Sequence, residues 1–327
     1  MEKLLEIENL SIRYRSDMGT VEAVNNLRLE LKKGETLGIV GETGAGKTTT
    51  AFGIIRLLPK KQSWIESGKV IFNGTDLNTL NEKKMSKIRG KEIAMIFQDP
   101  MTSLNPIQTV REQIAESIIL HSTIPKNKIR ERVNEVAEHV GLSKDRLNEY
   151  PHQYSGGMKQ RVIIAMALAC NPQLIIADEP TSALDVTIQA QILAMIDRLK
   201  KEYNTSMILI SHDLGVVVEM CDRVAIMYAG EIVETGVVED IYASPMHPYT
   251  KGLFNCIPYI DDRRERLDTI VGLMPDPTKL PSGCKFHPRC SKSMDCCVVK
   301  RPPTVDVKGH QISCWLYAES ENQRVKI

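Results

Sequence analysis

The eight residues Gly41-Glu42-Thr43-Gly44-Ala45-Gly46-Lys47-Thr48 decide which fold to expect of this chain. They fit the pattern G-x-x-x-x-G-K-[ST], which is typical of a loop that binds phosphate groups. The residues before them, 35–40, have the pattern of a short buried strand, and those from Lys47 to about Leu58 have the pattern of a helix that Pro59 ends. A glycine-rich loop between a strand and a helix N-terminus points backbone N–H groups and the positive end of the helix dipole at one place. The stretch therefore predicts a nucleoside triphosphate site in an α/β fold.

The residues of this site have separate expected roles. The Lys47 ammonium is expected to reach the β- and γ-phosphates, and the Thr48 hydroxyl to ligate Mg²⁺. Tyr14 ends a strand-like stretch at 4–15, and its ring is expected to stack on the base, although packing on the sheet would suit a tyrosine at a strand end almost as well. The residues predicted to bind the nucleotide here are Tyr14, Gly41, Glu42, Thr43, Gly44, Ala45, Gly46, Lys47, Thr48 and Thr49.

Composition narrows the class of protein. The chain has 327 residues and a net charge of +1, so a broadly basic surface for nucleic acid is not expected. No run approaches the ~18 apolar residues of a membrane-spanning helix. The first residues are acidic where a signal peptide would be basic and then apolar. We therefore expect a cytosolic protein with no nucleic-acid partner, long enough for one large domain and one smaller domain.

A second buried strand ends in two acidic residues. The run 174–177 is continuously apolar, which is typical of a central parallel strand, and Asp178 and Glu179 follow it directly. Carboxylates at a buried strand end are costly to desolvate and seldom serve structure alone. Asp178 is expected to hold Mg²⁺ through water, and Glu179 to polarise the attacking water as general base.

Two further strands end near polar residues. Gln98 ends the strand-like stretch 91–98, and His212 comes just after the strand-like stretch 206–210. Ligands of open α/β sheets bind at the carboxyl ends of the strands. The Gln98 amide is therefore expected to contact the metal or the attacking water, and the His212 imidazole to contact the γ-phosphate. Either residue alone would more often be structural, and only the company of the acidic pair favours catalysis.

A helical segment lies between these strands. From 101 to about 170 the apolar spacing is helical, which predicts a helical subdomain inserted in the sheet domain. Its last helix begins with the stretch Tyr154-Ser155-Gly156-Gly157-Met158-Lys159-Gln160. Ser155 is placed as an N-cap, and the glycines leave the helix N-terminus open to an anion. A capped helix with no further role explains these residues by themselves; a second phosphate, if one binds, has to come from another chain.

In their order along the chain, these motifs resemble those of the ATP-binding cassette ATPases, the nucleotide-binding subunits of ABC transporters. The resemblance covers about residues 1–250. It implies a RecA-like P-loop ATPase core with an antiparallel β subdomain and the inserted helical subdomain, and it implies ATP and Mg²⁺ as cofactors. The matching motifs are the Walker A loop 41–48, the Q-loop residue Gln98, the signature motif 154–160, the Walker B pair Asp178-Glu179, the D-loop Ser182–Asp185 and the switch histidine His212.

The resemblance also accounts for the second anion site. Two cassettes are expected to pair head to tail around two ATP molecules, so that Ser155, Gly156 and Gly157 contact the partner's ATP. The signature departs from the usual family pattern, because Tyr154 and Met158 stand where Leu and Gln are common. The Ser-Gly-Gly core that is expected to contact phosphate is kept.

Five of the eight cysteines lie between positions 284 and 314. Four of them, Cys284, Cys290, Cys297 and Cys314, are separated by five, six and sixteen residues, and Cys296 precedes the third. Zinc sites favour closely spaced C-x₂₋₄-C pairs, whereas an iron–sulfur cluster can be held by thiolates from irregular loops. From the residues alone, an iron–sulfur cluster, a zinc ion and free or partly paired thiols all stay open.

The C-terminal region resembles that of the oligopeptide and dipeptide importer ATPases. The matching stretches are Ser244–Thr250 and Gly283–Cys290, and the signature of these proteins also starts with Tyr or Phe before Ser-Gly-Gly-Met. The resemblance implies a small irregular domain at 251–327 that binds a metal cluster. The role of that cluster is either structural or redox. Its implied [4Fe–4S] ligands, with zinc as the alternative metal, are Cys284, Cys290, Cys297 and Cys314.

The function expected from this resemblance is ATP hydrolysis that powers the import of short peptides. The expected partners are a similar but non-identical second cassette, two transmembrane permease subunits and an extracellular peptide-binding protein. The chain is then expected on the cytoplasmic side of the cell membrane as a peripheral protein. Nickel import is the alternative cargo. A DNA-repair ATPase of the same family is disfavoured, because the segment between Gln98 and Ser155 is short and has no heptad run. A redox protein in which ATP gates electron transfer is the third alternative.

Overall fold

The structure is a computed structural model that describes residues 2–182, 184–256 and 270–318. The chain forms two compact units. The helical unit is built from Thr79–Ile210 with short pieces at Leu31–Thr36 and the N-terminus. The P-loop unit is built from Leu4–Glu30, Leu37–Asn78 and the described residues from Ser211 onward.

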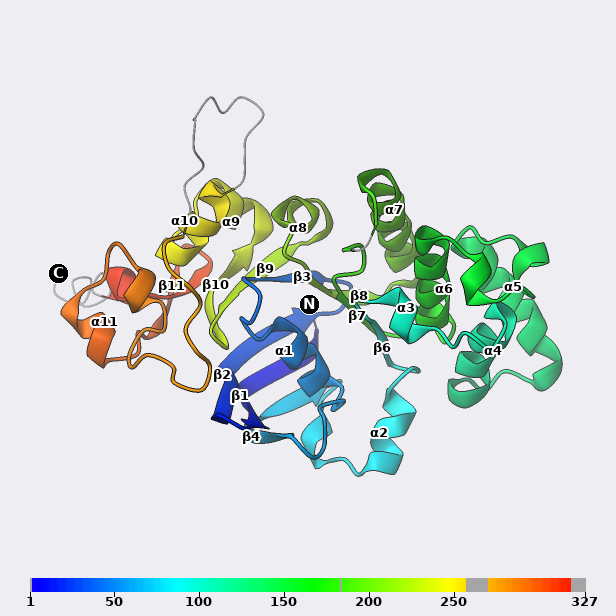
Figure 1. Ribbon diagram of the computed structural model, residues 1–327, viewed down its shortest axis with the longest axis horizontal. Helices are drawn as coiled ribbons and strands as arrows, with labels where there is room; N and C mark the ends of the chain where they lie inside the picture. The colour runs from blue at the N-terminus through cyan, green and yellow to red at the C-terminus, as the bar shows by residue number, and fades with distance from the viewer. Residues whose placement is uncertain (1, 183, 257–269, 319–327) are drawn as a thin grey trace. The chain divides into compact units, whose positions relative to one another are not determined.

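An antiparallel sheet forms one part of the P-loop unit (Figure 1). Its strands pair in the order β2-β1-β4-β5, and Asn73 and Gly74 turn the chain between β4 and β5 with positive φ angles. β1 covers the strand expected at 4–15, although its buried and more exposed residues alternate only at 5–8 and residues 10–12 are all buried. The strands are β1 (Lys3–Ser16), β2 (Gly19–Lys32), β4 (Ser63–Phe72) and β5 (Thr75–Asp76).

A second, mixed set of strands carries the phosphate-binding loop. In the P-loop unit these strands lie in the order β11-β12-β10-β9-β3. β3 is parallel to β9, and the other pairs are antiparallel. All five residues of β3 are buried, as its apolar run predicts. The strands are β3 (Thr36–Val40), β9 (Arg223–Tyr228), β10 (Glu231–Val237), β11 (Thr304–Val307) and β12 (His310–Ser313).

Helix α1 (Lys47–Ile54) is shorter than the helix expected to reach about Leu58. Arg56 adopts a positive φ of 53°, and the Leu57 N–H donates to the Phe52 carbonyl at 2.9 Å. This is a Schellman ending, in which a left-handed residue turns the chain back over the last helical carbonyls. The expectation was wrong because it relied on Pro59 as the stop signal. The other helices of this unit are α8 (Leu214–Met220), α9 (Val238–Ala243), α10 (Pro248–Asn255) and α11 (Asp295–Val299).

The C-terminal segment is less irregular than its sequence suggests. β11 and β12 form a hairpin whose turn residues Lys308 and Gly309 have positive φ angles, and β12 pairs with β10. Val305, Ile312 and Cys314 form a small apolar cluster under this hairpin. A strand of four residues is too short to show a clear alternation of apolar and polar residues in the sequence. Such strands are recognised only from their pairing with other strands in the structure. Residues 257–269 and 319–327 of the expected C-terminal domain lie outside the described residues.

The helical unit contains three parallel strands in the order β8-β7-β6 (Figure 1). They are β6 (Ile93–Ile96), β7 (Leu174–Asp178) and β8 (Ser206–Ile210), and every residue of β7 and β8 is buried. Burial on both faces explains why their sequences are continuously apolar. The segment expected to be helical holds α3 to α6. The helices of this unit are α2 (Glu82–Ile88), α3 (Pro100–Ser103), α4 (Val110–His121), α5 (Ile129–His139), α6 (Gly156–Leu168) and α7 (Val186–Tyr203). Within the described ranges, no helix is both long and apolar enough to cross a membrane.

Candidate nucleotide-binding site

The phosphate-binding loop joins β3 to α1 in the P-loop unit. Gly44 and Gly46 adopt φ angles of 85° and 105°, a region in which a side chain would strain the backbone. Gly46 is the N-cap of α1, and no side chain caps the helix there. The first N–H groups of α1 are therefore not taken by a capping side chain, and the helix dipole favours a negatively charged ligand at this end.

Lys47 is folded back onto the loop. Its ammonium donates hydrogen bonds to the carbonyl oxygens of Gly41 at 2.6 Å and Glu42 at 3.1 Å. Only 7% of the residue is exposed. A buried ammonium needs such partners because leaving a charge unpaired away from water is costly. The loop thus holds a positive charge in place at the N-terminus of α1.

Gly41 meets the backbone of β9 at close range, which gives a test of the loop's packing. A Cβ at this position would lie 2.1 Å from the Met227 carbonyl oxygen, so Gly41→Ala is expected to lower the free energy of unfolding by about 3 kcal/mol in urea denaturation. Gly44→Ala is the matched control, because its Cβ would meet no atom within 4 Å and its cost is limited to about 1 kcal/mol of backbone strain. A loss for Gly41→Ala no larger than that of the control would contradict the close approach.

Tyr14 lies beside the start of α1. Its hydroxyl is 3.5 Å from the hydroxyl oxygen of Thr49, and its ring is half-buried at the end of β1. Thr48 and Thr49 are also half-buried. The structure therefore brings Tyr14 together with the helix that follows the phosphate-binding loop, within a single unit.

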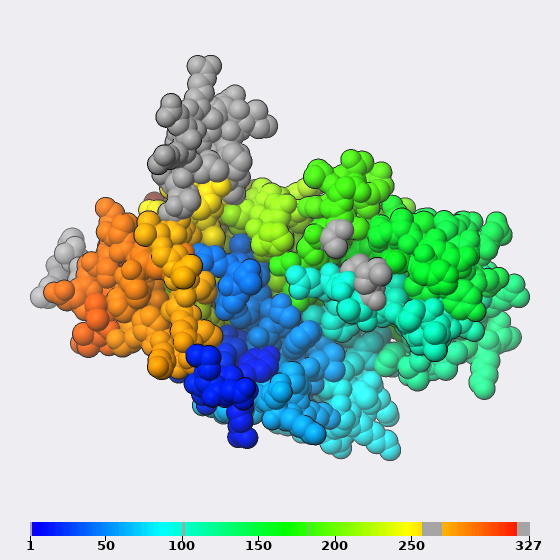
Figure 2. Space-filling view, in the orientation of Figure 1, coloured from blue at the N-terminus to red at the C-terminus, as the bar shows by residue number. Residues whose placement is uncertain are grey.

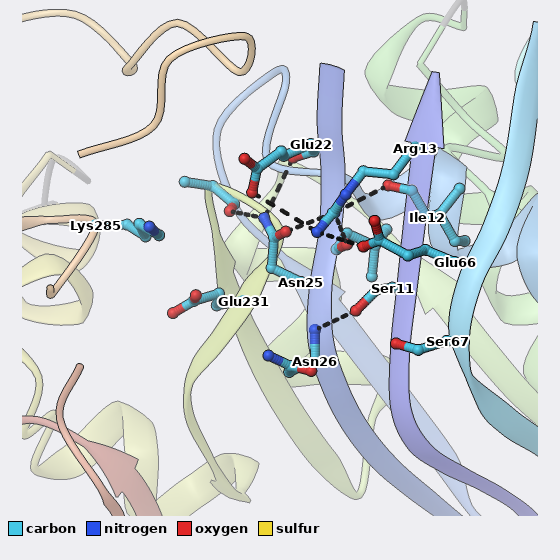
Figure 3. Close-up of polar contacts among 12 residues, drawn as sticks. Ser11, Ile12, Arg13, Glu22, Asn25, Asn26, Glu66, Ser67, Glu231 and Lys285 are labelled. Atoms are coloured by element: carbon cyan, nitrogen blue, oxygen red, sulfur yellow. Dashed lines mark hydrogen bonds and ion pairs between the residues drawn. The ribbon is translucent and has the colours of Figure 1, made fainter. Parts of the chain in front are cut away.

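A polar network connects strands β1 and β2 to the phosphate-binding loop, and Figure 3 shows its Arg13, Asn25 and Glu66 side chains. The Arg13 guanidinium donates to the Asn25 side-chain oxygen at 2.7 Å and forms an ion pair with Glu66 at 2.8 Å. The Asn25 backbone N–H donates to the Gly230 carbonyl at 2.8 Å, and the Gly230 N–H donates to the Ala45 carbonyl at 2.9 Å. Hydrogen bonds thus run from β1 through the turn after β9 to the phosphate-binding loop. No sequence motif indicates this network, because its members are far apart in the chain.

The acidic pair and Gln98 lie together in the helical unit. Asp178 is the last residue of β7 and is buried, and Glu179 follows with a positive φ of 46°. The Glu179 N–H donates to the Ile210 carbonyl at 2.9 Å. The Gln98 amide nitrogen donates to Glu179 Oε2 at 2.9 Å. A non-glycine residue in the left-handed region costs roughly 1–2 kcal/mol, and such strain is concentrated at functional sites.

The signature residues open helix α6 in the same unit. Ser155 is the N-cap, and its side chain accepts a hydrogen bond from the Met158 N–H at 3.4 Å. Ser155 and Gly156 are exposed. A Cβ at Gly157 would lie 2.6 Å from Ile188 of α7, so the helix start is closely packed on that side. The arrangement leaves a capped but accessible helix N-terminus.

The two remaining motifs precede helices. Asp185 of the D-loop caps α7 by accepting the Ile188 N–H at 3.0 Å, and Ala183 lies outside the described residues. His212 is exposed in the P-loop unit, two residues after the end of β8. Its neighbour Asp213 caps α8. Both motifs therefore stand at the beginnings of helices that follow buried strands.

Four cysteine thiols of the C-terminal segment influence one another. Burial raises the pKa of the Cys284 thiol to about 11, with smaller contributions from Cys297, Cys314 and Cys290. Burial likewise raises the pKa of Cys314 to about 11, with contributions from Cys290 and Cys297. Cys296 is not among these neighbours. In the part of the chain that the structure describes, no three His, Cys, Asp or Glu side chains are arranged to hold a single metal ion.

Two residues that the sequence analysis missed contact the phosphate-binding loop. The Tyr249 hydroxyl accepts a hydrogen bond from the Glu42 N–H at 2.9 Å, and Arg289 forms an ion pair with the Glu42 carboxylate at 2.9 Å. Both belong to stretches that carry the resemblance to the peptide importers, Ser244–Thr250 and Gly283–Cys290. That resemblance was the only sequence signal for them, and it indicated no contact.

The chain is similar to known proteins over nearly its whole length. The sequence model of the ABC transporter family matches residues 24–182, and that of the oligopeptide/dipeptide transporter C-terminal region matches residues 233–297. The oligopeptide transport ATP-binding protein AppD of Bacillus subtilis is 46% identical over 98% of this chain and 98% of its own length. The oligopeptide transport ATP-binding protein OppD of the same organism is 48% identical over 96% of this chain and 89% of its own length. The dipeptide transport ATP-binding protein DppD of that organism is 46% identical, with coverage of 97% and 95%.

Solved structures agree with these relatives on the fold. The ATP-binding cassette MJ0796, solved as a dimer in a post-hydrolysis state with ADP and Pi, is 29% identical with a TM-score of 0.65, over 72% of this chain and 99% of its own. The protein cbiO1 from Clostridium perfringens, part of the ABC transporter complex cbiONQ, is 27% identical with a TM-score of 0.65, over 75% of this chain and 92% of its own. The α/β cassette fold expected from the motifs is thereby confirmed. Because nearly half its residues match those of full-length relatives, the chain belongs to the ABC transporter ATP-binding proteins of the oligopeptide and dipeptide transport family.

Proposed function

We propose that this chain is the ATPase subunit of an importer of dipeptides and oligopeptides. The observation that carries the proposal is the similarity to peptide transport ATP-binding proteins, which extends through the C-terminal region as well as the cassette. The chain would act on the cytoplasmic side of the cell membrane, with two permease subunits, a second cassette and an extracellular peptide-binding protein. These partners follow from the family and not from any contact in the structure.

The proposed ATP site is built on the phosphate-binding loop. In the P-loop unit, residues 41–49 hold the phosphates, Lys47 neutralises the β- and γ-phosphates, and Tyr14 stacks on the adenine. His212 hydrogen-bonds the γ-phosphate. The uncapped N-terminus of α1, the buried ammonium of Lys47 and the position of Tyr14 beside Thr49 support these roles.

Magnesium would be held by oxygen ligands of three residues. The Thr48 hydroxyl, the Gln98 amide oxygen and, through water, the Asp178 carboxylate are of the hard oxygen type that Mg²⁺ prefers. The ion would neutralise charge on the phosphates during transfer. Glu179 would take a proton from the attacking water, and its hydrogen bond to Gln98 holds the carboxylate in one orientation.

The signature residues are proposed to serve a second cassette. Ser155, Gly156 and Gly157 would contact the partner's ATP, and the exposed N-terminus of α6 supports this role. In the relative MJ0796 the cassette was solved as a dimer. In this family the second cassette is expected to be a similar, non-identical chain.

The four C-terminal cysteines are proposed to bind a [4Fe–4S] cluster in the domain at 251–327. The donor set fits, because all four thiols are buried or half-buried, and the raised pKa values of Cys284 and Cys314, caused mainly by burial, also carry contributions from other members of the set but not from Cys296. A cubane cluster reaches thiolates that are farther apart than the ligands of one zinc ion, which agrees with the lack of a single-ion arrangement among the described side chains. The iron–sulfur cluster would stabilise the fold of a short segment that can bury only a small apolar core.

Cys314→Ser is expected to abolish iron binding after anaerobic purification. Wild-type protein should then contain about four irons and four sulfides per chain and absorb broadly near 400 nm, and Cys290→Ser should lose both signals as well. Cys296→Ser is the matched control and should keep the cluster. Each variant should still bind ATP at high nucleotide concentration, which separates cluster loss from unfolding. Zinc without iron in the wild-type protein, or equal loss in the control, would overturn the assignment.

Peptide import is tested by deleting the gene in its host and measuring uptake of radiolabelled dipeptides, pentapeptides and nickel. Loss of peptide uptake, restored by the wild-type gene but not by a Glu179→Gln copy, is the expected result. Loss of nickel uptake alone would replace peptide by nickel as the cargo. The Glu179→Gln copy is the control that ties uptake to ATP hydrolysis and not merely to the presence of the chain.

A further inference from the structure

We propose that Tyr249 and Arg289 position the phosphate-binding loop by holding Glu42, so that the cysteine-bearing C-terminal segment sets the affinity of the site for ATP. The proposal rests on the proposed nucleotide site and adds a regulatory connection to it. Figure 2 shows the orange C-terminal residues packed against the blue residues of the N-terminal strands within the P-loop unit, and the Glu22 N–H donates to the Pro277 carbonyl at 2.8 Å.

Glu42 is held at three separate atoms. Its backbone N–H donates to the Tyr249 hydroxyl at 2.9 Å, and its carboxylate pairs with Arg289 at 2.9 Å. Its carbonyl oxygen accepts from the Lys47 ammonium at 3.1 Å. Glu42 thus links two residues from the C-terminal part of the chain directly to the lysine that is proposed to bind phosphate. A shift of Glu42 therefore moves the carbonyl oxygen that accepts a hydrogen bond from the Lys47 ammonium.

Arg289 is fixed well enough to act as an anchor. Its side chain is only 7% exposed, and its guanidinium also donates to the Val271 carbonyl at 3.1 Å and the Ile270 carbonyl at 3.4 Å. It lies over the Tyr228 ring, 5.8 Å from the centroid. Charge-assisted hydrogen bonds of an arginine this well covered are stronger than those of an exposed ion pair.

Tyr249 belongs to a buried aromatic cluster that links its contact with Glu42 to Phe286 of the cysteine-bearing segment. Its ring centroid lies 4.7 Å from that of Tyr228 and 5.4 Å from that of Phe286. Burial raises the pKa of the Tyr249 hydroxyl, so the group stays protonated. The Tyr249 N–H donates to His247 Nδ1 at 3.0 Å, and burial lowers the pKa of His247 to about 3, which keeps that nitrogen available as an acceptor. The three rings each turn about only two χ angles and lie in contact, so a displacement of Phe286 is expected to be passed on to Tyr249.

The cysteine segment is attached to this cluster by its own backbone. Phe286 and Arg289 lie between Cys284 and Cys290, and the short helical turn at His287–Arg289 fixes their spacing. Whatever orders the cysteines therefore also orders Phe286 and Arg289. Loss of that order would release the Glu42 carboxylate and weaken the hold on Lys47.

The test compares ATP affinity among variants of the full chain. Arg289→Ala is expected to raise the dissociation constant for a fluorescent ATP analogue about tenfold, while kcat at saturating ATP stays within about twofold because Glu179 and Gln98 are untouched. Lys292→Ala is the matched control, since it removes a positive charge from an exposed position of the same segment. Arg289→Lys, which keeps the charge, should recover part of the affinity.

A double-mutant cycle decides whether the effect passes through Glu42. Glu42→Gln and Arg289→Ala are each expected to weaken binding, and the double variant is expected to be no weaker than the worse single variant. Additive losses of ATP affinity in the double variant would overturn the connection. It would also be overturned if Arg289→Ala and Lys292→Ala bound the ATP analogue equally well while wild-type protein bound it normally. Failure of wild-type protein to bind ATP would instead overturn the proposed function. If Arg289→Ala does not fold, Arg289→Lys and Glu42→Gln give the same comparison from either side of the ion pair.

Discussion

Glu179→Gln is expected to stop ATP turnover while ATP still binds. The substitution keeps the size of the side chain and lets its amide oxygen accept the hydrogen bond that Gln98 donates at 2.9 Å. It removes the carboxylate that is proposed to take a proton from the attacking water, and loss of a general base lowers rates about 10²–10⁴-fold. Steady-state phosphate release should fall by that factor, while the dissociation constant for ATP changes little. The bound nucleotide should be recovered as ATP and not as ADP.

Glu116→Gln is the control for this prediction, because it makes the same change on an exposed part of α4. Its turnover should match the wild-type protein. A Glu179→Gln chain that keeps turnover within about tenfold of wild type would remove Glu179 as the base. In the presence of a partner cassette, the trapped ATP should also hold the two cassettes together, which size-exclusion chromatography with and without ATP would measure.

Lys47→Ala is expected to abolish measurable ATP binding. The ammonium lies at the N-terminus of α1, and it is held by two carbonyl oxygens of the loop, at 2.6 Å and 3.1 Å. Removing it deletes the charge that is proposed to face the phosphates and leaves those carbonyls without this donor. Hydrogen bonds to charged groups contribute about 1.5–3 kcal/mol each, so the loss of two phosphate contacts predicts a drop of about 10²-fold or more. Equilibrium binding of a fluorescent ATP analogue is the measurement.

Two comparisons make the Lys47 result specific. Lys60→Ala changes an exposed lysine beyond α1 and should bind ATP like the wild-type protein. A thermal melt should show that Lys47→Ala remains folded, because the fold of the unit depends on its sheets and not on the ammonium. Retained ATP affinity in a folded Lys47→Ala chain would contradict the assignment of residues 41–48 as the phosphate site.

The local parts of the fold were readable in the sequence. β7 and β8 are continuous apolar runs bounded by polar residues, and the structure places β8 at the predicted residues. The cap of α6 is the single residue predicted for it, Ser155, which bonds to the N–H group three positions on. Such features depend on residues a few positions apart. Sequence periodicity and capping chemistry record them directly.

The end of α1 marks the limit of that kind of inference. Arg56 ends the helix in a left-handed conformation, although arginine is a good helix former and Pro59 lies beyond it. Its guanidinium donates to the Leu77 carbonyl at 2.9 Å, a partner from another part of the unit. Tertiary contact therefore outweighed local propensity at this position.

By itself, the sequence determined the strand–loop–helix that binds phosphate, the buried strands that end in polar side chains and the family to which the chain belongs. Only the tertiary structure decided that Glu42 is held by Tyr249, 207 positions away, and by Arg289, 247 positions away. It also decided that β12 adds to β10, and which of the crowded cysteines influence one another. The physical reason is that such contacts depend on how separate segments pack, and no local periodicity of a chain records which distant residue will fill a given place.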